Sequence, residues 1–281
     1  MKDFCRKLLA LVMLGCSPVF AAPGPFGYTA WDVSGSDILL RIDLSTGVGT
    51  TIGAGIGFND VDALAFQQGT GNLFGVNDST NQLIRINTVT GVGTAIGSGF
   101  GSGFNDMGLA FASNGTLYMS STDTAGTTGR LYTVDTITGA ATVIGQTGSV
   151  RLRSLGFHGG TLYGWSNIDT LVTVNTATGA VTTVGSFNFA SLVDGQDGMD
   201  IDPQTGIIWA ISEIEGRTYT LSSLTGAATI MATSLTCDGA NCMATGGFNS
   251  LAIPVPEPEP FYLMAAGLLL TAAVARRRRR G

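Results

Sequence analysis

Acid–base chemistry in this 281-residue chain would rest mainly on carboxylates, because the sequence contains a single histidine, His158. A pair of carboxylates can cleave a glycosidic bond when the two groups lie about 5 to 9.5 Å apart, and Asp62 and Asp197 are candidates for such a pair. His158 lies in a Gly-rich turn, and no neighbouring motif supplies a nucleophile or an orienting carboxylate. A solvated turn histidine is the simpler interpretation, so we expect no catalytic residues.

Oxygen-bearing side chains gather before several predicted strands, where they could bind a cation. They are Asn59, Asp60, Asp62, Asn105, Asp106, Asp194, Asp197, Asp200 and Asp202. None of these groups has the spacing of an EF-hand, and Asn and Asp are frequent in turns that hold no metal. We therefore predict no metal site and no cofactor, with a structural Ca²⁺ ion as the alternative.

Two further pairs of residues indicate chemistry of other kinds. Four residues, one of them glycine, separate Cys237 from Cys242, and this spacing lets the two sulfurs meet in an exported protein. A zinc site would need two more Cys or His ligands, and the body of the chain offers only His158, so we predict a disulfide. Arg151 and Arg153 could contact an acidic saccharide, although a role in balancing neighbouring carboxylates is the simpler interpretation.

Charge is unevenly distributed along the chain. The overall net charge is −6, but basic residues gather at both ends, and residues 22–255 contain six arginines, no lysine and 17 acidic residues. The net charge of this body is therefore −11, which repels a phosphate backbone. We exclude nucleic acid as a partner. Disorder is excluded too, because 44% of the residues are hydrophobic.

A Thr-Gly pair recurs five times along the body, at intervals of 44, 48, 40 and 47 residues. The pairs begin at Thr46, Thr90, Thr138, Thr178 and Thr225. Each lies between two runs of alternating polar and apolar residues that are rich in β-branched side chains, such as RLYTVDT (130–136) and ATVIG (141–145). These runs predict two strands joined by a tight turn.

Two more predicted strands complete each unit, for example DMGLAF (106–111) and TLYMSST (116–122). Four strands in roughly 45 residues are typical of a propeller blade. The first unit lacks its opening strand, whereas an isolated segment with the opening-strand pattern, FNSLAI (248–253), follows the fifth unit. We therefore predict an all-β fold, a β-propeller of five four-stranded blades whose ring is closed by the C-terminal strand.

The opening strands alternate small and large residues. One column is small and contains Ala63, Gly108, Ser154, Gly198 and Ser250, and the column beside it is large and contains Leu64, Leu109, Leu155, Met199 and Leu251. Successive side chains of a strand point to opposite faces. We therefore expect the large face of one blade to pack on the small face of the next.

The first 21 residues have the pattern of a secretory signal peptide. A basic start precedes an apolar stretch from Leu8 to Leu14, and Val19, Phe20 and Ala21 form the small-residue exit. The apolar stretch is too short to span a bilayer stably. We expect cleavage after Ala21, and lipid attachment at Cys16 is the alternative.

Residues 255–281 combine three elements in a fixed order. A proline-rich motif begins with Val255, Pro256, Glu257 and Pro258. It is followed by an apolar run at 261–275 and by five consecutive arginines. The run corresponds to about 22 Å of helix, and interfacial aromatic residues and snorkelling arginines could extend it to a transmembrane helix with a cytoplasmic arginine end.

This arrangement resembles the PEP-CTERM sorting signal of Gram-negative bacteria, a signal that typically occurs in species that export a polysaccharide matrix. The resemblance implies that an exosortase, a membrane transpeptidase, recognises Pro256, Glu257 and Pro258 and removes the helix. Glu259 also lies between prolines, so the motif could be shifted by two residues. The segment LYTVDTITGAATVIG (131–145) resembles exported propeller-like repeats of many bacteria, which bears on fold rather than on activity.

We therefore divide the chain into a signal peptide (1–21), a propeller-like repeat domain (22–254) and a sorting signal (255–281). Our leading hypothesis is an exported, non-catalytic binding or scaffolding protein, held transiently in the inner membrane and then delivered to the cell surface or extracellular matrix. The expected partners are the exosortase and an exopolysaccharide or surface protein. The alternative is a propeller hydrolase or lyase that acts on polysaccharide through channel carboxylates.

Overall fold

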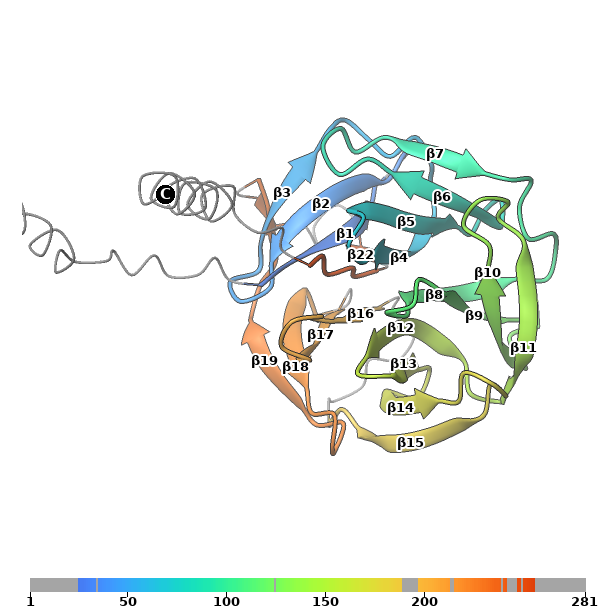
Figure 1. Ribbon diagram of the computed structural model, residues 1–281. Helices are drawn as coiled ribbons and strands as arrows, with labels where there is room; N and C mark the ends of the chain where they lie inside the picture. Colours follow the sequence, from blue (N-terminus) through green and yellow to red (C-terminus); the bar gives the residue numbers. More distant parts are fainter. Residues whose placement is uncertain are drawn as a thin grey trace, which may run out of the picture.

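The computed structural model shows the body of the chain as a ring of five β-sheets (Figure 1). The residues it describes are 25–33, 35–123, 125–188, 197–212, 215–238, 240–241, 247–248 and 250–255. The body is thus an all-β, five-bladed propeller, as the repeats predict. Over these residues, the structure contains no helix long and apolar enough to cross a membrane.

Four of the five blades are four-stranded antiparallel sheets in which consecutive strands lie side by side. The second blade comprises β4 (Val61–Gln67), β5 (Asn72–Asn77), β6 (Gln82–Ile86) and β7 (Gly93–Ile96). The third comprises β8 (Asn105–Phe111), β9 (Leu117–Thr122), β10 (Gly129–Val134) and β11 (Ala141–Gly148). The fourth comprises β12 (Leu152–His158), β13 (Thr161–Ser166), β14 (Thr170–Val174) and β15 (Val181–Ser186). The fifth comprises β16 (Asp197–Ile201), β17 (Ile208–Ser212), β18 (Arg217–Leu221) and β19 (Ala228–Ala232).

The first blade is built from both ends of the body. β1 (Phe26–Asp32), β2 (Ile38–Asp43) and β3 (Val48–Ile52) pair in order, and β22 (Gly247–Phe248) pairs with the inner edge of β1. Beyond β22, Tyr28 and Ala252 exchange two backbone hydrogen bonds of 2.8 Å. The predicted closure of the ring by the C-terminal segment is confirmed.

The first blade has six strands rather than the expected four. The hairpin of β20 (Thr236–Cys237) and β21 (Ala240–Asn241) extends its outer edge, and β20 runs parallel to β3. The repeat pattern assigns this insertion to the last blade, because it follows the fifth unit. That assignment is wrong, because the outer edge of β3 offers unpaired backbone groups to the hairpin.

Neighbouring blades pack as the alternation of small and large residues predicts. Leu109 of the third blade lies in one buried cluster with Ala63 of the second. Leu155 of the fourth blade likewise shares a cluster with Ala110 of the third. Small residues on one opening strand thus leave the space that large residues of the next strand fill, and the expected packing is confirmed.

A second seam runs around the outside of the ring and is made by glycines. A glycine within or directly after the outer strand of one blade lies against the Thr-Gly turn of the next blade. A Cβ atom on Gly97 would lie 1.9 Å from the carbonyl oxygen of Thr138, and one on Gly145 would lie 2.0 Å from that of Thr178. Only a residue without a side chain permits this approach, which explains why Ile-Gly and Val-Gly recur in or directly after the fourth strands.

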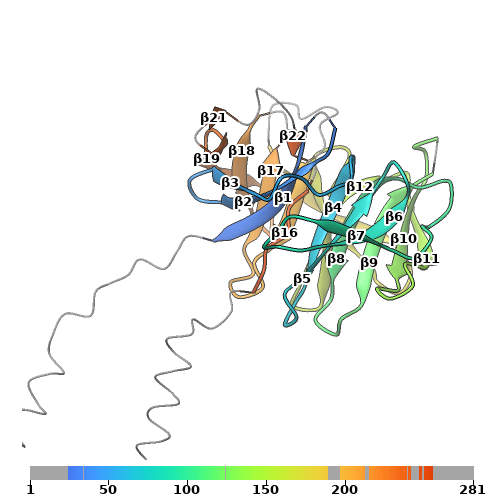
Figure 2. The same cartoon turned by 90° about the horizontal axis from the view of Figure 1, so that it is seen from above.

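The two ends of the ring differ, and we name each by what it carries. Counted from the inside of the ring, the first and third strands of each blade run toward the end at which Val255 lies. The turns that follow these strands form that end, the tail face. The opposite end, where the opening strands begin, is the acidic face. Figure 2 shows that both ends of the coloured chain leave the ring on the same side, which is the tail face.

Candidate functional site

A pocket of about 460 Å³ opens on the tail face, around the ends of the inner strands. Matching positions of the second to fifth blades line it together with the end of the closing segment. The lining residues are Ala65, Phe66, Gln68, Ala110, Phe111, Ser113, Phe157, His158, Gly159, Gly160, Asp200, Ile201, Pro203 and Val255. We call this cavity the tail-face pocket.

Aromatic side chains form the apolar part of the tail-face pocket. Phe66 and Phe111 lie at or near the ends of their opening strands, and each packs against an aromatic residue of the preceding blade. The ring centroids lie 5.2 Å apart for Tyr28 and Phe66, and 5.3 Å apart for Phe74 and Phe111. The walls of the pocket are therefore fixed by the contacts between blades, as in most ligand sites.

Asp200 supplies a carboxyl group to the tail-face pocket. It occupies a position at which the neighbouring blades have alanine or glycine, such as Ala110. Its two carboxylate oxygens accept hydrogen bonds of 2.7 Å from the backbone N–H groups of Ile201 and Ile253. Burial raises the pKa of Asp200 to about 7, although these hydrogen bonds act in the opposite direction. Asp200 thus joins the fifth blade to the closing segment.

The expected grouping of Asp200 and Asp202 with the acidic residues at the blade entrances is wrong. Both lie at the tail face, because the opening strand β16 carries the chain from one end of the ring to the other. An extended strand advances about 3.3 Å per residue. Asp202 serves its own turn, where Oδ1 accepts a 2.9 Å hydrogen bond from the N–H of Gln204.

Two other polar side chains of the pocket have defined surroundings. Gln68 donates from Nε2 to the carbonyl of Ile253 at 3.3 Å and accepts from the N–H of Val255 at 3.1 Å. His158 ends β12 and is half-buried against Gly206. A Cβ atom added to Gly206 would lie only 2.8 Å from Nε2 of His158. His158 is thus part of the pocket wall rather than the solvated turn residue that we expected.

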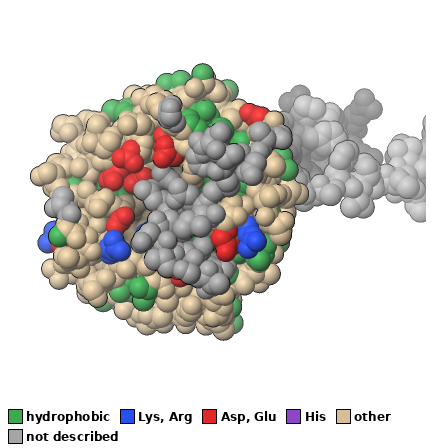
Figure 3. Space-filling view, turned by 180° about the vertical axis from the view of Figure 1, so that it is seen from behind, with side chains coloured by type: hydrophobic (Ala, Val, Ile, Leu, Met, Phe, Trp, Pro, Cys, Tyr) green, Lys and Arg blue, Asp and Glu red, His purple; other side chains and the backbone are tan. Residues whose placement is uncertain are grey.

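Carboxylates from the first three blades gather on the acidic face (Figure 3). Asp62 is buried beside a register shift in β4, between Val61 and Ala63. Burial, and after it the charge of Asp78, raises the pKa of Asp62 well above its ordinary value. Protonated Asp62 donates a hydrogen bond to Asp78, and burial raises the pKa of Asp78 to about 6. The two carboxyl groups share a proton.

The contact between Asp62 and Asp78 limits what this pair can catalyse. Two hydrogen-bonded carboxyl groups leave no room for a glycosidic bond, which requires a separation of about 5 to 9.5 Å. The side chain of Asp197 lies outside the described residues, as does Asp194, so the pairing of Asp62 with Asp197 stays a prediction. In the part of the chain that the structure describes, no three His, Cys, Asp or Glu side chains are arranged to hold a metal ion.

Arg151 links two blades on the acidic face. Its guanidinium group lies 3.3 Å from the carboxylate of Asp106, so an arginine of the fourth blade pairs with an aspartate of the third. This contact confirms for Arg151 the expected role in balancing a neighbouring carboxylate. The other member of the predicted cationic pair, Arg153, lies two residues further on in β12.

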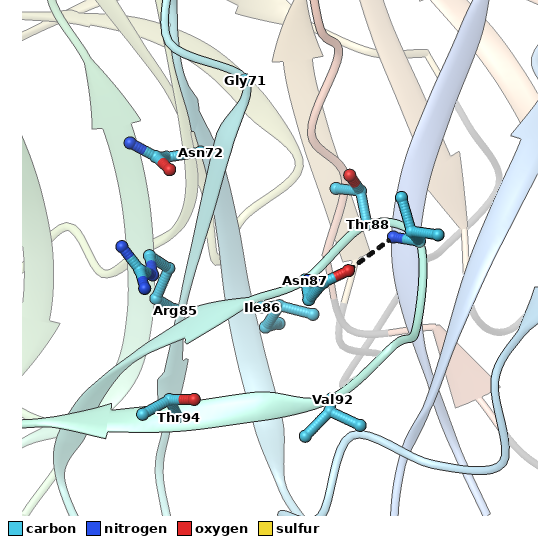
Figure 4. A pocket seen from close by; sticks show the side chains of 9 residues that line it. Gly71, Asn72, Arg85, Ile86, Asn87, Thr88, Val92 and Thr94 are labelled. Carbon is cyan, nitrogen blue, oxygen red and sulfur yellow. Dashed lines mark hydrogen bonds between the residues drawn. The ribbon is translucent and has the colours of Figure 1, made fainter.

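A second pocket, of about 370 Å³, lies on the second blade beside the tail face (Figure 4). Asn72, Arg85 and Thr94 line it from three adjacent strands, and the turn that contains Val89 bounds it. Asn87 Oδ1 accepts a 2.9 Å hydrogen bond from the N–H of Val89. Sequence reasoning missed this pocket. The signal that was present is Arg85, an arginine within the alternating run before a Thr-Gly turn.

Several predicted features fall partly or wholly outside the described residues. Val255 lies at the tail face, whereas Pro256, Glu257, Pro258 and Cys242 lie outside. Cys237 is buried and disulfide-bonded, and its pairing with Cys242 stays a prediction. The signal peptide (1–21) and the apolar run (261–275) lie outside as well.

Five blades around one axis, closed by a C-terminal segment and hollowed at the tail face, define a β-propeller with one pocketed mouth and one acidic mouth. The repeats themselves belong to a known sequence family. The chain is a member of the family described as "Repeat of unknown function (DUF6923)", whose model matches residues 49–243. A search of curated proteins found no match.

Solved structures resemble the chain at low sequence identity. A chain of the nidogen/laminin complex is 12% identical with a TM-score of 0.52, and the match covers 81% of this chain and 98% of that one. A structural genomics protein of unknown function from Bacteroides thetaiotaomicron is 15% identical with a TM-score of 0.48, and the match covers 62% of this chain but only 43% of that one. A catalytically inactive virginiamycin B lyase from Staphylococcus aureus, solved with quinupristin, is 15% identical with a TM-score of 0.42, over 74% of this chain and 70% of the other. At these identities the likeness concerns the fold alone.

Proposed function

We propose that the protein is an exported, non-catalytic binding or scaffolding propeller, which an exosortase-type system sorts to the cell surface or extracellular matrix. The observation that carries this proposal is the tail-face pocket, where matching positions of four blades converge on one cavity. Its volume of about 460 Å³ falls within the range of roughly 300 to 1,000 Å³ that is usual for ligand sites.

The pocket chemistry favours a neutral segment of exopolysaccharide over an acidic one. Neither lysine nor arginine lines the pocket, whereas Asp200 places a carboxyl group in it. Sugar hydroxyls can donate hydrogen bonds to this carboxyl group and to Gln68, and the apolar faces of sugar rings can pack against Phe157. An acidic saccharide would meet Asp200 and the negative body without a compensating cation.

Blocking the pocket tests this binding role. Ser113 is exposed and lines the pocket, so Ser113→Trp fills the cavity without disturbing the core. We expect this variant to bind an array of neutral glycans at least about tenfold more weakly than the wild type. A tenfold loss of affinity corresponds to roughly the binding free energy of one well-packed contact. Ser149→Trp, an equally exposed change on the acidic face, is the control and retains binding. Equal binding by both variants, or depolymerisation of matrix by the wild type, contradicts the proposal.

Sorting is tested separately by fractionation of the tagged protein in cells with and without an exosortase. We expect the C-terminal tag to be removed, and the body to reach the surface, only when the exosortase is present. A tail that stays attached in both strains would leave a plain membrane anchor. Glycan binding is measured on the detergent-solubilised protein and does not depend on that result.

A further inference from the structure

The tips of three Thr-Gly turns carry large aliphatic side chains that are almost fully exposed to solvent. Val89, Ile137 and Leu224 occupy matching positions in the second, third and fifth blades, and their exposed fractions are 84%, 86% and 87%. These turns connect the third and fourth strands, so all three tips project from the tail face. They therefore surround the tail-face pocket with apolar side chains that meet water.

Charge on the tail-face turns is low and is already engaged. Asp43, Asp135 and Asp202 belong to these turns, and each accepts hydrogen bonds from backbone N–H groups of its own turn. The clustered carboxylates, including Asp62 and Asp78, lie at the opposite end of the ring. The molecule is therefore polarised, with apolar tips at one end and negative charge at the other.

Arg85 adds a cation next to one of these tips. It precedes the last residue of β6, and together with Asn72 it lines the smaller pocket that the Val89 turn bounds (Figure 4). At the matching position of the first blade, Arg41 lies over the ring of Phe26, 3.8 Å from the centroid. Arg85 forms no ion pair with the residues that the structure describes. In a lipid surface a phosphate layer about 5 to 7 Å thick covers the hydrocarbon. An apolar tip that reaches the hydrocarbon would leave the exposed arginine beside it at the level of the phosphates.

The chain also leaves the ring on the tail face. Val255 is 38% exposed there, and its N–H is held by Gln68. Five residues, 256–260, separate it from the apolar run at 261–275. The six residue steps from Val255 to the start of the run span at most about 22 Å. A run that enters a bilayer therefore keeps the tail face within this distance of the lipid surface.

We infer that the tail face docks on a phospholipid bilayer while the tail is attached, with Val89, Ile137 and Leu224 entering the interface and Arg85 facing lipid phosphate. This inference rests on the proposed membrane insertion of the tail. A second copy of the chain is a poorer occupant, because two bodies of net charge −11 repel each other. Docking also covers the tail-face pocket, so ligand binding begins only after the tail is removed.

Quenching of tryptophan fluorescence by brominated phosphatidylcholine tests the docking. The full chain is reconstituted into vesicles of this lipid as Ile137→Trp and, as a matched control, as Ile168→Trp. Ile168 is 67% exposed on a turn of the acidic face, so both changes leave the core intact. We expect bromine to quench the tryptophan at position 137 at least about twofold more than that at position 168, because only an interfacial side chain contacts the acyl region.

Each other outcome overturns the inference. Equal quenching of the two variants in vesicles that carry the protein means that the body is tethered but does not dock. If the chain does not float with vesicles, the tail does not anchor it in the bilayer. Glycan binding, which tests the binding role of the pocket, is measured independently. A blue shift of the tryptophan at position 137 that persists without lipid assigns the face to a second copy instead.

Discussion

Four junctions between blades follow the repeat, whereas the junction between the fifth and first blades departs from it, and the two kinds are held differently. At the four repeated junctions a glycine such as Gly97 lies against the Thr-Gly turn of the next blade. At the closing junction Ala232 replaces that glycine, and a Cβ atom on Gly47 would lie 2.4 Å from the carbonyl oxygen of Ser234. The hairpin β20–β21 then follows on the outer edge of the first blade.

Polar side chains also hold the closing segment on its inner side, from the fifth blade and from the second. Asp200 accepts the N–H of Ile253, and Gln68 bonds to both Ile253 and Val255. The other blades have alanine or glycine in place of Asp200. The closing segment pairs with β1 without a connecting turn, so directed hydrogen bonds help to specify its position, because apolar packing alone is not directional.

The largest effect should come from the glycine seam. Gly97→Ala places a Cβ atom 1.9 Å from a backbone oxygen at a φ of 69°, so we expect a loss of about 3 kcal/mol or more in the free energy of unfolding. Gly115→Ala is the matched control, because its φ is 86° but no atom lies within 4 Å of the added Cβ. It should cost only about 1 to 2 kcal/mol. Urea unfolding measures both, and equal losses would show that the seam contact contributes nothing.

The disulfide should have the next largest effect, at the closing junction. Cys237→Ser removes a bridge that closes a short loop if Cys242 is its partner, and such a loop stabilises by about 2 kcal/mol. The same loss should follow from reduction of the wild type. Mass spectrometry under non-reducing conditions checks the pairing, and free thiols in the exported protein would contradict it.

The Asp200 carboxylate should contribute somewhat less. Asp200→Asn keeps the shape of the side chain but turns an NH₂ donor toward one of the two N–H groups that the carboxylate bonds. We expect a loss of about 1 to 3 kcal/mol in the free energy of unfolding. Asp202→Asn keeps the acceptor that its turn requires and should stay within about 0.5 kcal/mol of wild type. If both variants match the wild type, the closing segment does not depend on Asp200.

The smallest effect concerns pH. Because the pKa of Asp200 is raised to about 7, the folded protein binds a proton that the unfolded chain has lost above about pH 4, and stability falls as the pH rises toward 7. Burial raises the pKa values of Asp37 and Asp78 to about 6. These two groups therefore lose their protons, and with them their contribution to stability, at a lower pH than Asp200 does. Between pH 6 and 7.5 we expect the wild type to lose on the order of 1 kcal/mol.

Asp200→Asn should lose less stability than the wild type over the same interval from pH 6 to 7.5, because it removes one of the carboxyl groups whose raised pKa makes stability fall as the pH rises. The other such groups, Asp37, Asp62 and Asp78, remain. Chemical unfolding at a series of pH values makes the comparison. An equal slope in the wild type and the variant would assign the pH dependence to other groups.

The blades could be predicted from the sequence because strand alternation and turn residues are local. A two-residue period and Thr-Gly pairs such as Thr138-Gly139 identify strands and turns without knowledge of their neighbours. Closure could be predicted as well, because the segment at 248–253 repeats a pattern that the first unit lacks. The candidate site could not be predicted. Asp62 and Asp200 are both aspartates of opening strands, and they differ only in the end of the strand at which each lies.

Local pattern along the sequence therefore determined the class of fold, the number of blades and the closing segment. The tertiary structure alone decided which residues meet. It brought Asp200 to the pocket, Asp62 to Asp78, and the hairpin at Cys237 to the first blade rather than the last. The physical reason is that backbone alternation depends on adjacent residues, whereas burial, shared protons and pockets depend on distances between segments far apart in the chain.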